Sequence, residues 1–381
     1  MKNIKIAIDA TRNRSGGARI HLIELLKNFQ YEKYNLDKIY LWSYPELLNK
    51  IPDYPWLKKY SPFKKKVSIL KELHWQNTKL PKILKKLDID ILLNTTATSV
   101  CYFKPNVTMS RDMLSFEKGI IKKSGFSIGR LRLILLKHIQ KISLKNANGV
   151  IFLTKYASNV LQSYTGSLKN FKIINHGISK KFFIKKPILK DNKKLRCIYV
   201  SNIDFYKHQS NVVKALSRFK ENEVELVLAG GPGNGVPALI EKRKLDKAIA
   251  ELSVNFVTLL GHVKHNEIPA LYRNCDIIIF ASSCENMPNT LVEGMASGLP
   301  IASSNLGPMP EILKDAGNYF DPNNIESIYQ AVKPLVESKS LRDSLSSKSY
   351  ELSKKFSWEK CSDKTFDYII DTYKNKKMYF K

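Results

Sequence analysis

The sequence 275-CDIIIFASSCENMPNTLVEGMASGLPIASSNLG-307 contains two apolar runs on either side of a segment with helical signals. The first run is continuously apolar, which is typical of a strand buried on both faces of a parallel sheet. A helix is predicted to begin near Pro288, where a missing N–H costs nothing, and to end near Gly298, because Pro300 cannot continue it. The second run, 300-PIASSNLG-307, predicts another strand, so the stretch forms a β-α-β unit.

The same alternation extends in both directions along the chain and predicts an α/β fold. A charged, proline-containing segment at 185–194 interrupts the alternation and is interpreted as a linker. The sequence therefore predicts two doubly wound Rossmann-like domains facing across a cleft, residues 1–188 and 189–355, with a helix at 356–381 that crosses back to the first domain. The predicted strands are, in order, KIAIDAT, KIYLWSY, DIDILLNTT, NVTMSRD, NGVIFLT and FKIINHGI, then RCIYVSN, VELVLAGG, FVTLLGHV, CDIIIFASS and PIASSNLG.

Length and cysteine usage limit the class of protein. At 381 residues the chain exceeds the size at which a single core keeps growing, which also favours two domains. The five cysteines form no Cys-x-x-Cys pair, so neither a zinc site nor a disulfide framework is expected. No window approaches the ~20 apolar residues of a membrane span, and the N-terminal run is interrupted by Lys5 and Asp9, unlike a signal peptide. We therefore expect a cytoplasmic protein.

Charge is the strongest compositional signal, with 63 Lys and Arg against 34 Asp and Glu and a net charge of +29. The segment 118–145 interleaves basic residues with leucine and isoleucine at near-helical spacing, and no acidic residue lies between Glu117 and Asp191. Such a surface suits peripheral attachment to an anionic membrane, here the inner face of the plasma membrane. A solvated helix face explains it equally well. Lysine predominates and no aromatic-rich binding signature interrupts the basic runs, so no nucleic-acid partner is expected.

The start of the helix predicted after Pro288 is suited to binding an anion. Its first N–H groups, those of Asn289, Thr290 and Leu291, have no acceptor inside the helix and carry the positive end of the helix dipole. A phosphate or diphosphate is the preferred ligand of such a terminus. Glu293 lies on the second turn, within reach of a ribose diol attached to that phosphate.

Glu285 follows the end of the apolar strand, where side chains point toward the ligand crevice of a doubly wound sheet. There its carboxylate could accept hydrogen bonds from the hydroxyls of a second polyol. A phosphate between two polyols describes a nucleotide sugar. The alternative is that Glu293 only complements the helix dipole and that Glu285 is a solvated loop residue; each alternative is favoured when its glutamate is considered by itself.

Together, these motifs resemble the retaining GT-B glycosyltransferases of family 4 (group 1). The resemblance covers nearly the whole chain, is dense from 197 to 362 and thins between 45 and 100. Its elements, in order, are Gly16-Gly17 after the first strand, VIFLTKYAS, NHGI before the linker, SNIDFYKHQS with Lys207, AGGPG, the Glu285-x7-Glu293 pair and FSWEK.

The resemblance implies a role for each matching residue. Glu285 would orient the donor sugar and stabilise positive charge at its anomeric carbon, Lys207 would neutralise the departing diphosphate, and Glu293 would hold the ribose. The backbone near Thr290 would share the phosphate charge. A front-face mechanism without metal or other cofactor is expected, because the glutamates serve opposite ends of the donor rather than flanking one bond. The remaining implied donor contacts are Gly16, Gly17, Asn286, Met287, Asn289 and Leu291.

The chain departs from the family pattern at two places. Asn202 stands where members often carry a phosphate-binding arginine. Arg111-Asp112 replaces a frequent His-Asp pair; Arg111 could bind an anionic group of a substrate, or form a structural salt bridge with Asp112. The sequence Asp88-Ile89-Asp90 matches a metal motif of another glycosyltransferase architecture, but it precedes a strand and is interpreted as a turn.

The predicted function is sugar transfer from a UDP- or GDP-sugar to a saccharide or lipid-linked acceptor, in cell-surface polysaccharide or lipopolysaccharide synthesis. Two alternatives remain. A non-catalytic basic protein that binds membrane or nucleic acid would explain the charge and leave the glutamate pair unexplained. A nucleotide-sugar epimerase of the same architecture would use the donor without an acceptor. The sequence identifies neither the sugar nor the base, the linkage or the oligomeric state.

Overall fold

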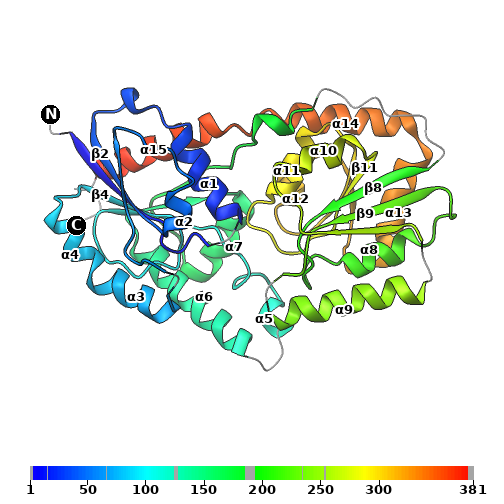
Figure 1. The fold of residues 1–381 in the computed structure, drawn as a ribbon, viewed down its shortest axis with the longest axis horizontal. Helices are drawn as coiled ribbons and strands as arrows, with labels where there is room; N and C mark the ends of the chain where they lie inside the picture. Colours follow the sequence, from blue (N-terminus) through cyan, green and yellow to red (C-terminus); the bar gives the residue numbers. More distant parts are fainter. Residues whose placement is uncertain are drawn as a thin grey trace. The chain divides into compact units, whose positions relative to one another are not determined.

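A computed structural model of the chain describes residues 3–14, 16–65, 67–123, 128–184, 194–233, 235–252 and 255–375 (Figure 1). The chain forms two compact units. The first unit comprises residues 1–177 and 357–381, and the second comprises residues 178–356. The chain thus passes into the second unit at residue 178, whereas the sequence placed this boundary after residue 188. The predicted linker at 185–194 lies almost entirely outside the described residues.

The first unit is built on a seven-stranded parallel sheet with strand order β3-β2-β1-β4-β5-β6-β7. Its elements are β1 (Ile4–Asp9), α1 (Gly16–Lys27), β2 (Leu36–Trp42), α2 (Pro45–Leu48), β3 (Leu57–Tyr60), α3 (Ile69–Thr78), α4 (Leu80–Lys86), β4 (Ile91–Asn94), β5 (Asn106–Met109), α5 (Ile120–Lys123), α6 (Ile128–Asn146), β6 (Gly149–Phe152), α7 (Lys155–Thr165), β7 (Phe171–Ile173) and α15 (Trp358–Lys374).

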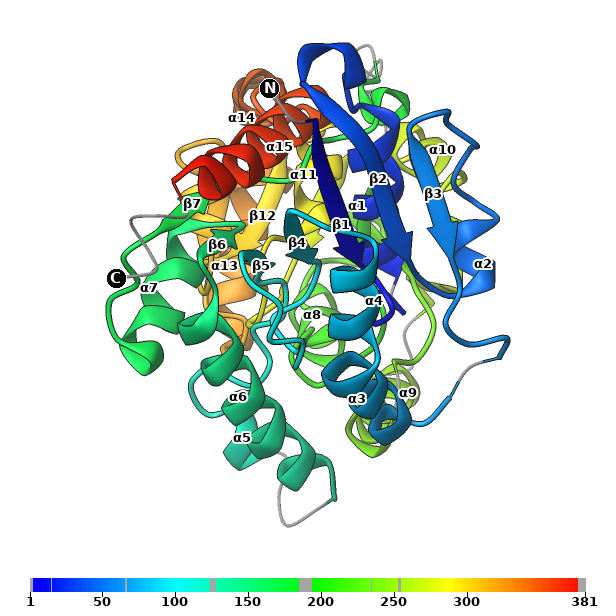
Figure 2. The same cartoon turned by 90° about the vertical axis from the view of Figure 1, so that its left-hand side faces the viewer.

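Helices pack against both faces of this sheet. Figure 2 shows α15 above the strands and α3, α4 and α6 below them. Trp75 of α3 and Leu84 of α4 belong to one buried cluster with Ala7 and Leu92 of the central strands. On the other side, α15 contacts α1 as well as β4, β5 and β6. Because both faces are covered, the central strands β1, β4 and β6 are buried along nearly their whole length, as the sequence indicated.

The second unit is built on a six-stranded parallel sheet with strand order β10-β9-β8-β11-β12-β13. Its elements are β8 (Leu195–Val200), α8 (Gln209–Leu216), β9 (Val224–Ala229), α9 (Val236–Glu251), β10 (Val257–Gly261), α10 (Ile268–Arg273), β11 (Ile277–Phe280), α11 (Asn289–Ala296), β12 (Ile301–Ser304), α12 (Met309–Leu313), β13 (Asn318–Phe320), α13 (Ile325–Glu337) and α14 (Lys339–Ser353); two single-turn 3₁₀ segments, Tyr31–Lys33 in the first unit and Lys180–Phe182 in the second, complete the assignment.

Each sheet has a switch point, where the strand order reverses. In the first sheet the reversal falls between β1 and β4, and in the second it falls between β8 and β11. In this class of fold, ligands bind at such a point, outside the carboxyl ends of the strands. Both units are therefore doubly wound α/β structures, which confirms the predicted fold class.

Every apolar run that was predicted as a strand forms one, whereas β3 and β13 were not predicted. These two strands lie at the edges of their sheets and have only three or four residues. An edge strand loses part of its surface to solvent, so it shows little of the continuous apolar character used to find the others. β3 has two lysines among its four residues and β13 has only three residues, so neither forms an apolar run that the sequence could show.

The basic segment 118–145 forms α5 and the greater part of α6, and residues 124–127 between the two helices lie outside the description. Three apolar side chains of α6, those of Leu131, Leu135 and Ile142, are exposed. Within the described residues, no helix combines the length and the apolar character that crossing a bilayer would require. All five cysteines are buried and free.

Candidate functional site

The clearest candidate site lies at the switch point of the second sheet. β8 and β11 pair directly through Cys197 and Ile277, so the loops that follow them leave the sheet side by side. The first loop carries Lys207 and the second carries Glu285. The Lys207 ammonium forms an ion pair with the Glu285 carboxylate, and the two side chains are only 12% and 16% exposed. The structure therefore brings together two residues that the sequence assigned to one site from positions 78 residues apart.

Hydrogen bonds fix the two loops to each other around this ion pair. The Ser283 N–H donates to the Tyr206 carbonyl at 2.8 Å, and the Ser283 hydroxyl lies 2.8 Å from Nε2 of His208. The backbone of His208 adopts a left-handed conformation with φ 54°. The buried Tyr199 hydroxyl donates to the Lys207 carbonyl at 2.9 Å. Burial, together with the nearby Glu285 charge, raises the pKa of Tyr199, so it remains a hydrogen-bond donor.

The helix predicted after the Glu285 loop is α11, which begins one residue after Pro288 and ends before Gly298, a glycine with φ +70°. Pro288 offers no side-chain cap. Asn289 and Thr290 are the first two helical residues, whose N–H groups have no acceptor four residues earlier within the helix. The Leu291 N–H, in contrast, already donates to the Pro288 carbonyl at 3.1 Å. Leu291 therefore does not offer the unpaired amide that the sequence assigned to it.

Glu293 is buried, with 7% of its surface exposed, and it belongs to a hydrogen-bonded group that the sequence did not reveal. One carboxylate oxygen lies 2.6 Å from Nε2 of His265, while Oε2 is buried without a partner in the described part of the chain. On the other side of the imidazole, the Lys181 ammonium lies 3.1 Å from Nδ1. Glu293 thus keeps one oxygen for a further donor. No local sequence signal identifies His265, because only the fold brings it to α11.

The AGGPG loop after β9 packs against the loop after β8. The Ile203 N–H donates to the Gly231 carbonyl at 2.9 Å, and the Gly233 N–H donates back to the Ile203 carbonyl at 2.8 Å. At Gly230, φ is +153° and an added Cβ would lie 1.9 Å from the Ser201 carbonyl oxygen. The glycine at this position is therefore required by the protein's own packing. Asn202, which stands at the family's arginine position, is exposed.

In the first unit, Gly16 opens α1, and an added Cβ there would meet no atom within 4 Å. Arg111, which follows β5, donates to the carbonyl of Gly17 at 3.0 Å and to that of Ala18 at 3.3 Å. Asp112 instead accepts the Leu114 N–H at 2.9 Å. The salt bridge between Arg111 and Asp112 that the sequence left open is therefore absent from the described residues: two backbone carbonyls take the guanidinium.

Burial affects both of these groups. Desolvation lowers the pKa of the Arg111 guanidinium to about 10, so it still carries its charge at neutral pH. Desolvation also raises the pKa of the Asp112 carboxyl, against the opposing effects of the Leu114 N–H and the positive charge of Arg132.

A buried aromatic cluster joins two of the motifs found in the sequence. The rings of His21 and His176 stack with centroids 4.5 Å apart, and Trp358 lies 5.6 Å from His21. An added Cβ at Gly177 would lie 2.2 Å from the Trp358 backbone nitrogen. The NHGI and FSWEK motifs therefore contact each other within the first unit. Burial, the Arg111 charge and His176 hold the pKa of His21 well below its usual range, which keeps that ring neutral.

The Asp88-Ile89-Asp90 sequence forms a turn before β4, as predicted. Asp88 has φ 55°, and the Asp90 carboxylate accepts the Lys5 N–H at 2.9 Å and the Tyr373 hydroxyl at 3.0 Å. Both acidic residues therefore lie at the amino end of the strand. No group of three or more potential metal ligands occurs among the described residues.

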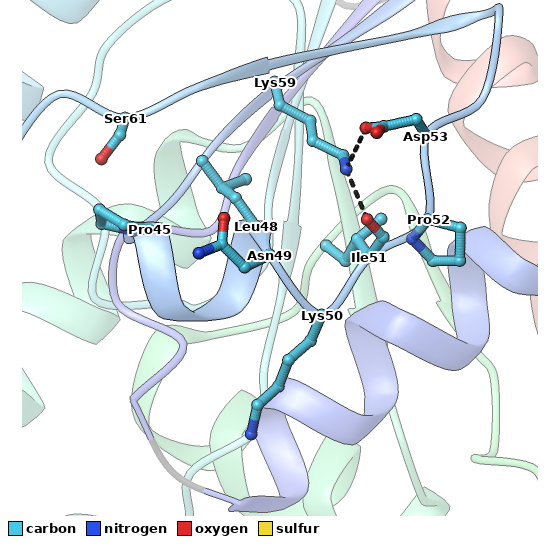
Figure 3. A pocket seen from close by; sticks show the side chains of 9 residues that line it. All are labelled: Pro45, Leu48, Asn49, Lys50, Ile51, Pro52, Asp53, Lys59 and Ser61. Carbon is cyan, nitrogen blue, oxygen red and sulfur yellow. Dashed lines mark hydrogen bonds and ion pairs between the residues drawn. The ribbon is translucent and has the colours of Figure 1, made fainter.

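A hollow of about 720 Å³ lies beside α2 and β3, in the region where the family resemblance is weakest (Figure 3). Its most prominent charged pair is Lys59 with Asp53, separated by 2.6 Å. Figure 3 shows the Lys59 ammonium directed toward Asp53 and the Ile51 carbonyl, while Lys50 extends away from them. Because the Lys59 charge is already satisfied within the protein, we assign no ligand to this hollow.

Comparison with solved structures identifies the fold of the chain. Sucrose-phosphate synthase from Thermosynechococcus elongatus superposes with a TM-score of 0.77 at 16% identity, covering 96% of this chain and 98% of that chain. HepE of Anabaena, in complex with UDP and glucose, superposes with a TM-score of 0.71 at 17% identity, covering 96% and 99%. The two parallel sheets thus form a GT-B fold.

Sequence comparison identifies the family. Residues 180–352 match the family described as "Glycosyl transferases group 1". Among curated proteins, O-antigen chain mannosyltransferase B of Escherichia coli is 29% identical over 112 residues, which are 29% of this chain and 29% of that protein. Residues 180–352 therefore belong to the glycosyl transferases group 1 family, and the predicted family and enzyme class are confirmed. The chain aligns with 34%, 29% and 49% of the lengths of three curated relatives, less than half of each.

Proposed function

We propose that this protein is a retaining glycosyltransferase that moves a sugar from a UDP- or GDP-sugar to a saccharide or lipid-linked acceptor. The observation that carries the proposal is the ion pair between Lys207 and Glu285 at the switch point of the second sheet. The proposed reaction needs a cation beside the leaving diphosphate and a carboxylate beside the sugar ring, at opposite ends of the bond that breaks. Two relatives support it: HepE holds UDP and glucose, and the Escherichia coli protein is an O-antigen mannosyltransferase.

In this reaction, the bond between the anomeric carbon and the diphosphate oxygen breaks while positive charge develops on the sugar ring. The Lys207 ammonium and the first amides of α11 stabilise the negative charge that accumulates on the leaving diphosphate. Glu285 accepts hydrogen bonds from the sugar hydroxyls and stabilises the positive ring. The acceptor hydroxyl attacks from the face that the diphosphate leaves, and its proton passes to a departing phosphate oxygen. The configuration of the sugar is therefore retained.

The donor would replace part of the present ion pair. Lys207 and Glu285 now satisfy each other, so neither charge is left unpaired in this half-buried site. When a diphosphate binds, it supplies new negative charge to Lys207, and the sugar hydroxyls supply new donors to Glu285. Glu293, with one oxygen held by His265, presents the other to the ribose. Asn286 and Met287, both buried in the loop between Glu285 and α11, would border the sugar.

The proposal is tested by the Glu285→Ala variant. Transfer from the nucleotide sugar that binds the wild-type protein should fall by about 10²–10³-fold, because a preorganised electrostatic contact to the transition state is lost. Circular dichroism should show the fold retained, and EDTA should not reduce wild-type turnover. The matched control is Glu251→Gln, an exposed glutamate of the same unit. Robust transfer by Glu285→Ala would remove the proposal.

We also propose that α6 attaches the first unit to an anionic lipid surface, consistent with a lipid-linked acceptor in cell-surface polysaccharide or lipopolysaccharide synthesis. Leu131, Leu135 and Ile142 recur at helical spacing and are 69%, 56% and 50% exposed. Basic residues flank them, and the sequence has no acidic residue from 118 to 190. An apolar stripe flanked by positive charge complements a bilayer with anionic headgroups, because the side chains insert while the charges remain at the surface.

Vesicle flotation tests this attachment. Binding of the wild-type protein should rise with the fraction of anionic lipid and fall with salt, because the electrostatic contribution is screened. Replacing Leu131 and Leu135 by serine should abolish most of the binding, whereas Leu239→Ser, an exposed leucine of α9, should not change it. Binding that is insensitive to salt and to both leucines would make α6 an ordinary solvated helix.

A further inference from the structure

Arginines are distributed unevenly in this lysine-rich chain. Only eleven of the 63 basic residues are arginines. Six of them belong to the first unit, and all six fall in the segments 12–19 and 111–132, which follow β1 and β5. They are Arg12, Arg14, Arg19, Arg111, Arg130 and Arg132. Arginine is preferred over lysine where a planar fork must bind a carboxylate or phosphate with two hydrogen bonds. Their position therefore requires an explanation.

The fold brings the two segments together at the carboxyl edge of the first sheet. β1 and β5 are parallel and are separated only by β4, so the loops after them leave the same edge. Arg111 joins the segments directly through its hydrogen bonds to the Gly17 and Ala18 carbonyls. Arg12, in the loop after β1, lies within electrostatic range of Arg132 on α6. This edge contains the switch point between β1 and β4, where a ligand crevice is expected.

The carboxylates near Arg12 and Arg14 are already engaged. The Glu72 carboxylate accepts hydrogen bonds from Arg14, at 2.6 Å, and from the Tyr44 hydroxyl. The two oxygens of Asp9 accept bonds from Thr11, at 2.7 Å, and from Gln76, at 2.6 Å. Arg14 is consequently a structural residue that connects the loop after β1 to α2 and α3.

Arg12 and Arg132, in contrast, make no ion pair or side-chain hydrogen bond in the described part of the chain, although Nη1 of Arg12 is buried. Desolvation, together with the positive charges of Arg14 and Arg132, lowers the pKa of Arg12 and outweighs the attraction of Glu72 and Asp9. Nε of Arg19, on the first turn of α1, is buried without a partner as well. Arg132 is exposed and lies within electrostatic range of Asp112, whereas Arg12 and Arg19 are half-buried. The cost of keeping a guanidinium group away from water without a partner, which a bound anion would remove, therefore falls on Arg12 and Arg19.

We propose that Arg12 and Arg132 bind an anionic group, a phosphate or a carboxylate, carried by the acceptor saccharide, with Arg19 at the border of the same site. The proposal rests on the proposed transfer reaction, because it assigns the second substrate a charge. Arg111 and Arg14 hold the two loops in place. Arg12 and Arg132 supply the two guanidinium groups that donate hydrogen bonds to the anion. A neutral hydroxyl would not offset the repulsion between two guanidinium charges, whereas one oxyanion would form charge-assisted hydrogen bonds with both.

Calorimetric titration with small probes tests this assignment. The probes are glucose 6-phosphate, glucuronate, inorganic phosphate and, as the neutral reference, glucose, all at one ionic strength set with sodium chloride. The variants are Arg12→Gln, Arg132→Gln and the charge-conserving Arg12→Lys. Lys145→Gln, which removes an exposed charge from the same helix as Arg132, is the matched control. A parallel titration with UDP and GDP monitors the donor site in every variant.

We expect one of the two anionic sugars to bind the wild-type protein and glucose not to bind, which identifies the anion as phosphate or carboxylate. The affinity for that sugar should fall roughly tenfold in Arg12→Gln and in Arg132→Gln, less in Arg12→Lys, and by under about twofold in Lys145→Gln. Nucleotide affinity should not change in any variant.

Three results would overturn the inference. The first is that neither anionic sugar binds better than glucose, and the second is that binding is the same in all variants. The third is that nucleotide affinity falls by the same factor as sugar affinity, which would assign the arginines to the donor diphosphate. Failure of the proposed function would look different, since the wild-type protein would then bind neither UDP nor GDP.

Discussion

The carboxyl edges of the two sheets have the same topology and different chemistry. In each unit the strand order reverses next to the first strand, β1 or β8, and the loops that follow the two strands at the reversal leave the sheet side by side. The second unit places one lysine and one glutamate there, already paired, followed by a helix N-terminus. The first unit places arginines there, and two of them are unpaired within the described residues. One edge is suited to a leaving group and a sugar, and the other to an anion.

Under the proposed reaction, two units of similar architecture would each bind one of the two substrates. In this class of fold the reversal of strand order alone creates a ligand crevice, so the crevice requires no particular residues. The side chains on the loops then determine which ligand each crevice accepts. Fold similarity at 16–17% identity therefore establishes the architecture, and the ligand of each edge has to be argued from its residues.

Glycines at the two edges provide the largest expected contrast. Gly230→Ala should lower the unfolding free energy of the second unit by about 3 kcal/mol, because the new Cβ would overlap the Ser201 carbonyl at an unfavourable φ. Gly16→Ala should change stability by less than about 0.5 kcal/mol, since its Cβ meets open space, and should weaken nucleotide binding. Urea unfolding followed by circular dichroism measures both. Equal stability losses would show that Gly16 is also held by protein packing.

Acidic pH should lower the stability of the first unit through His21. The pKa of His21 is held well below its usual range in the folded protein, so below pH 6.5 the unfolded chain binds a proton that the folded chain does not. Stability is therefore lost as the pH falls, by about 1.3 kcal/mol between pH 7.5 and 5.5 for this one group. His21→Phe keeps a ring against His176 and should remove that loss.

The comparison is between the pH slopes of the two proteins in urea unfolding, because the raised pKa values of Asp9, Glu72 and Asp112 act in the opposite direction in both. Identical slopes for wild type and His21→Phe would mean that His21 titrates normally in the folded chain.

The smallest expected effect concerns the residue that positions Glu293. His265→Phe keeps an aromatic ring beside Phe182 and removes the hydrogen bond to the carboxylate. The KM for the nucleotide sugar should rise about fivefold, the worth of one hydrogen bond, with little change in kcat. His262→Phe changes an exposed histidine of the preceding turn and is the control. A fall in kcat alone would place His265 in the chemical step instead of in donor binding.

The sequence predicted the second edge better than the first because its signals are local. Pro288, Gly298 and Pro300 mark the ends of α11 within a few residues of Glu285, so strand, turn and helix could be placed without knowing the fold. Lys207 was assigned to this site only through the family resemblance, and its ion pair with Glu285 was not predicted. His265 was missed, since nothing near it in the sequence indicates that it bonds to Glu293.

In the first unit the important contacts join distant segments. Arg111 was recognised as an unusual residue, but its acceptors at Gly17 and Ala18 are 94 and 93 residues away. Arg12 and Arg132 attracted no attention, because their proximity depends on the strand order. The NHGI and FSWEK motifs were noted separately, and only the fold shows that they pack together through Trp358.

The most direct measurement is the affinity of the Lys207→Gln variant for the nucleoside diphosphate that binds the wild-type protein. If the carboxyl edge of the second sheet holds the leaving diphosphate, the Kd should rise at least tenfold, while Lys214→Gln, an exposed lysine of α8, should bind like the wild type. Equal affinity of the two variants would contradict the account, because the diphosphate would then be held elsewhere.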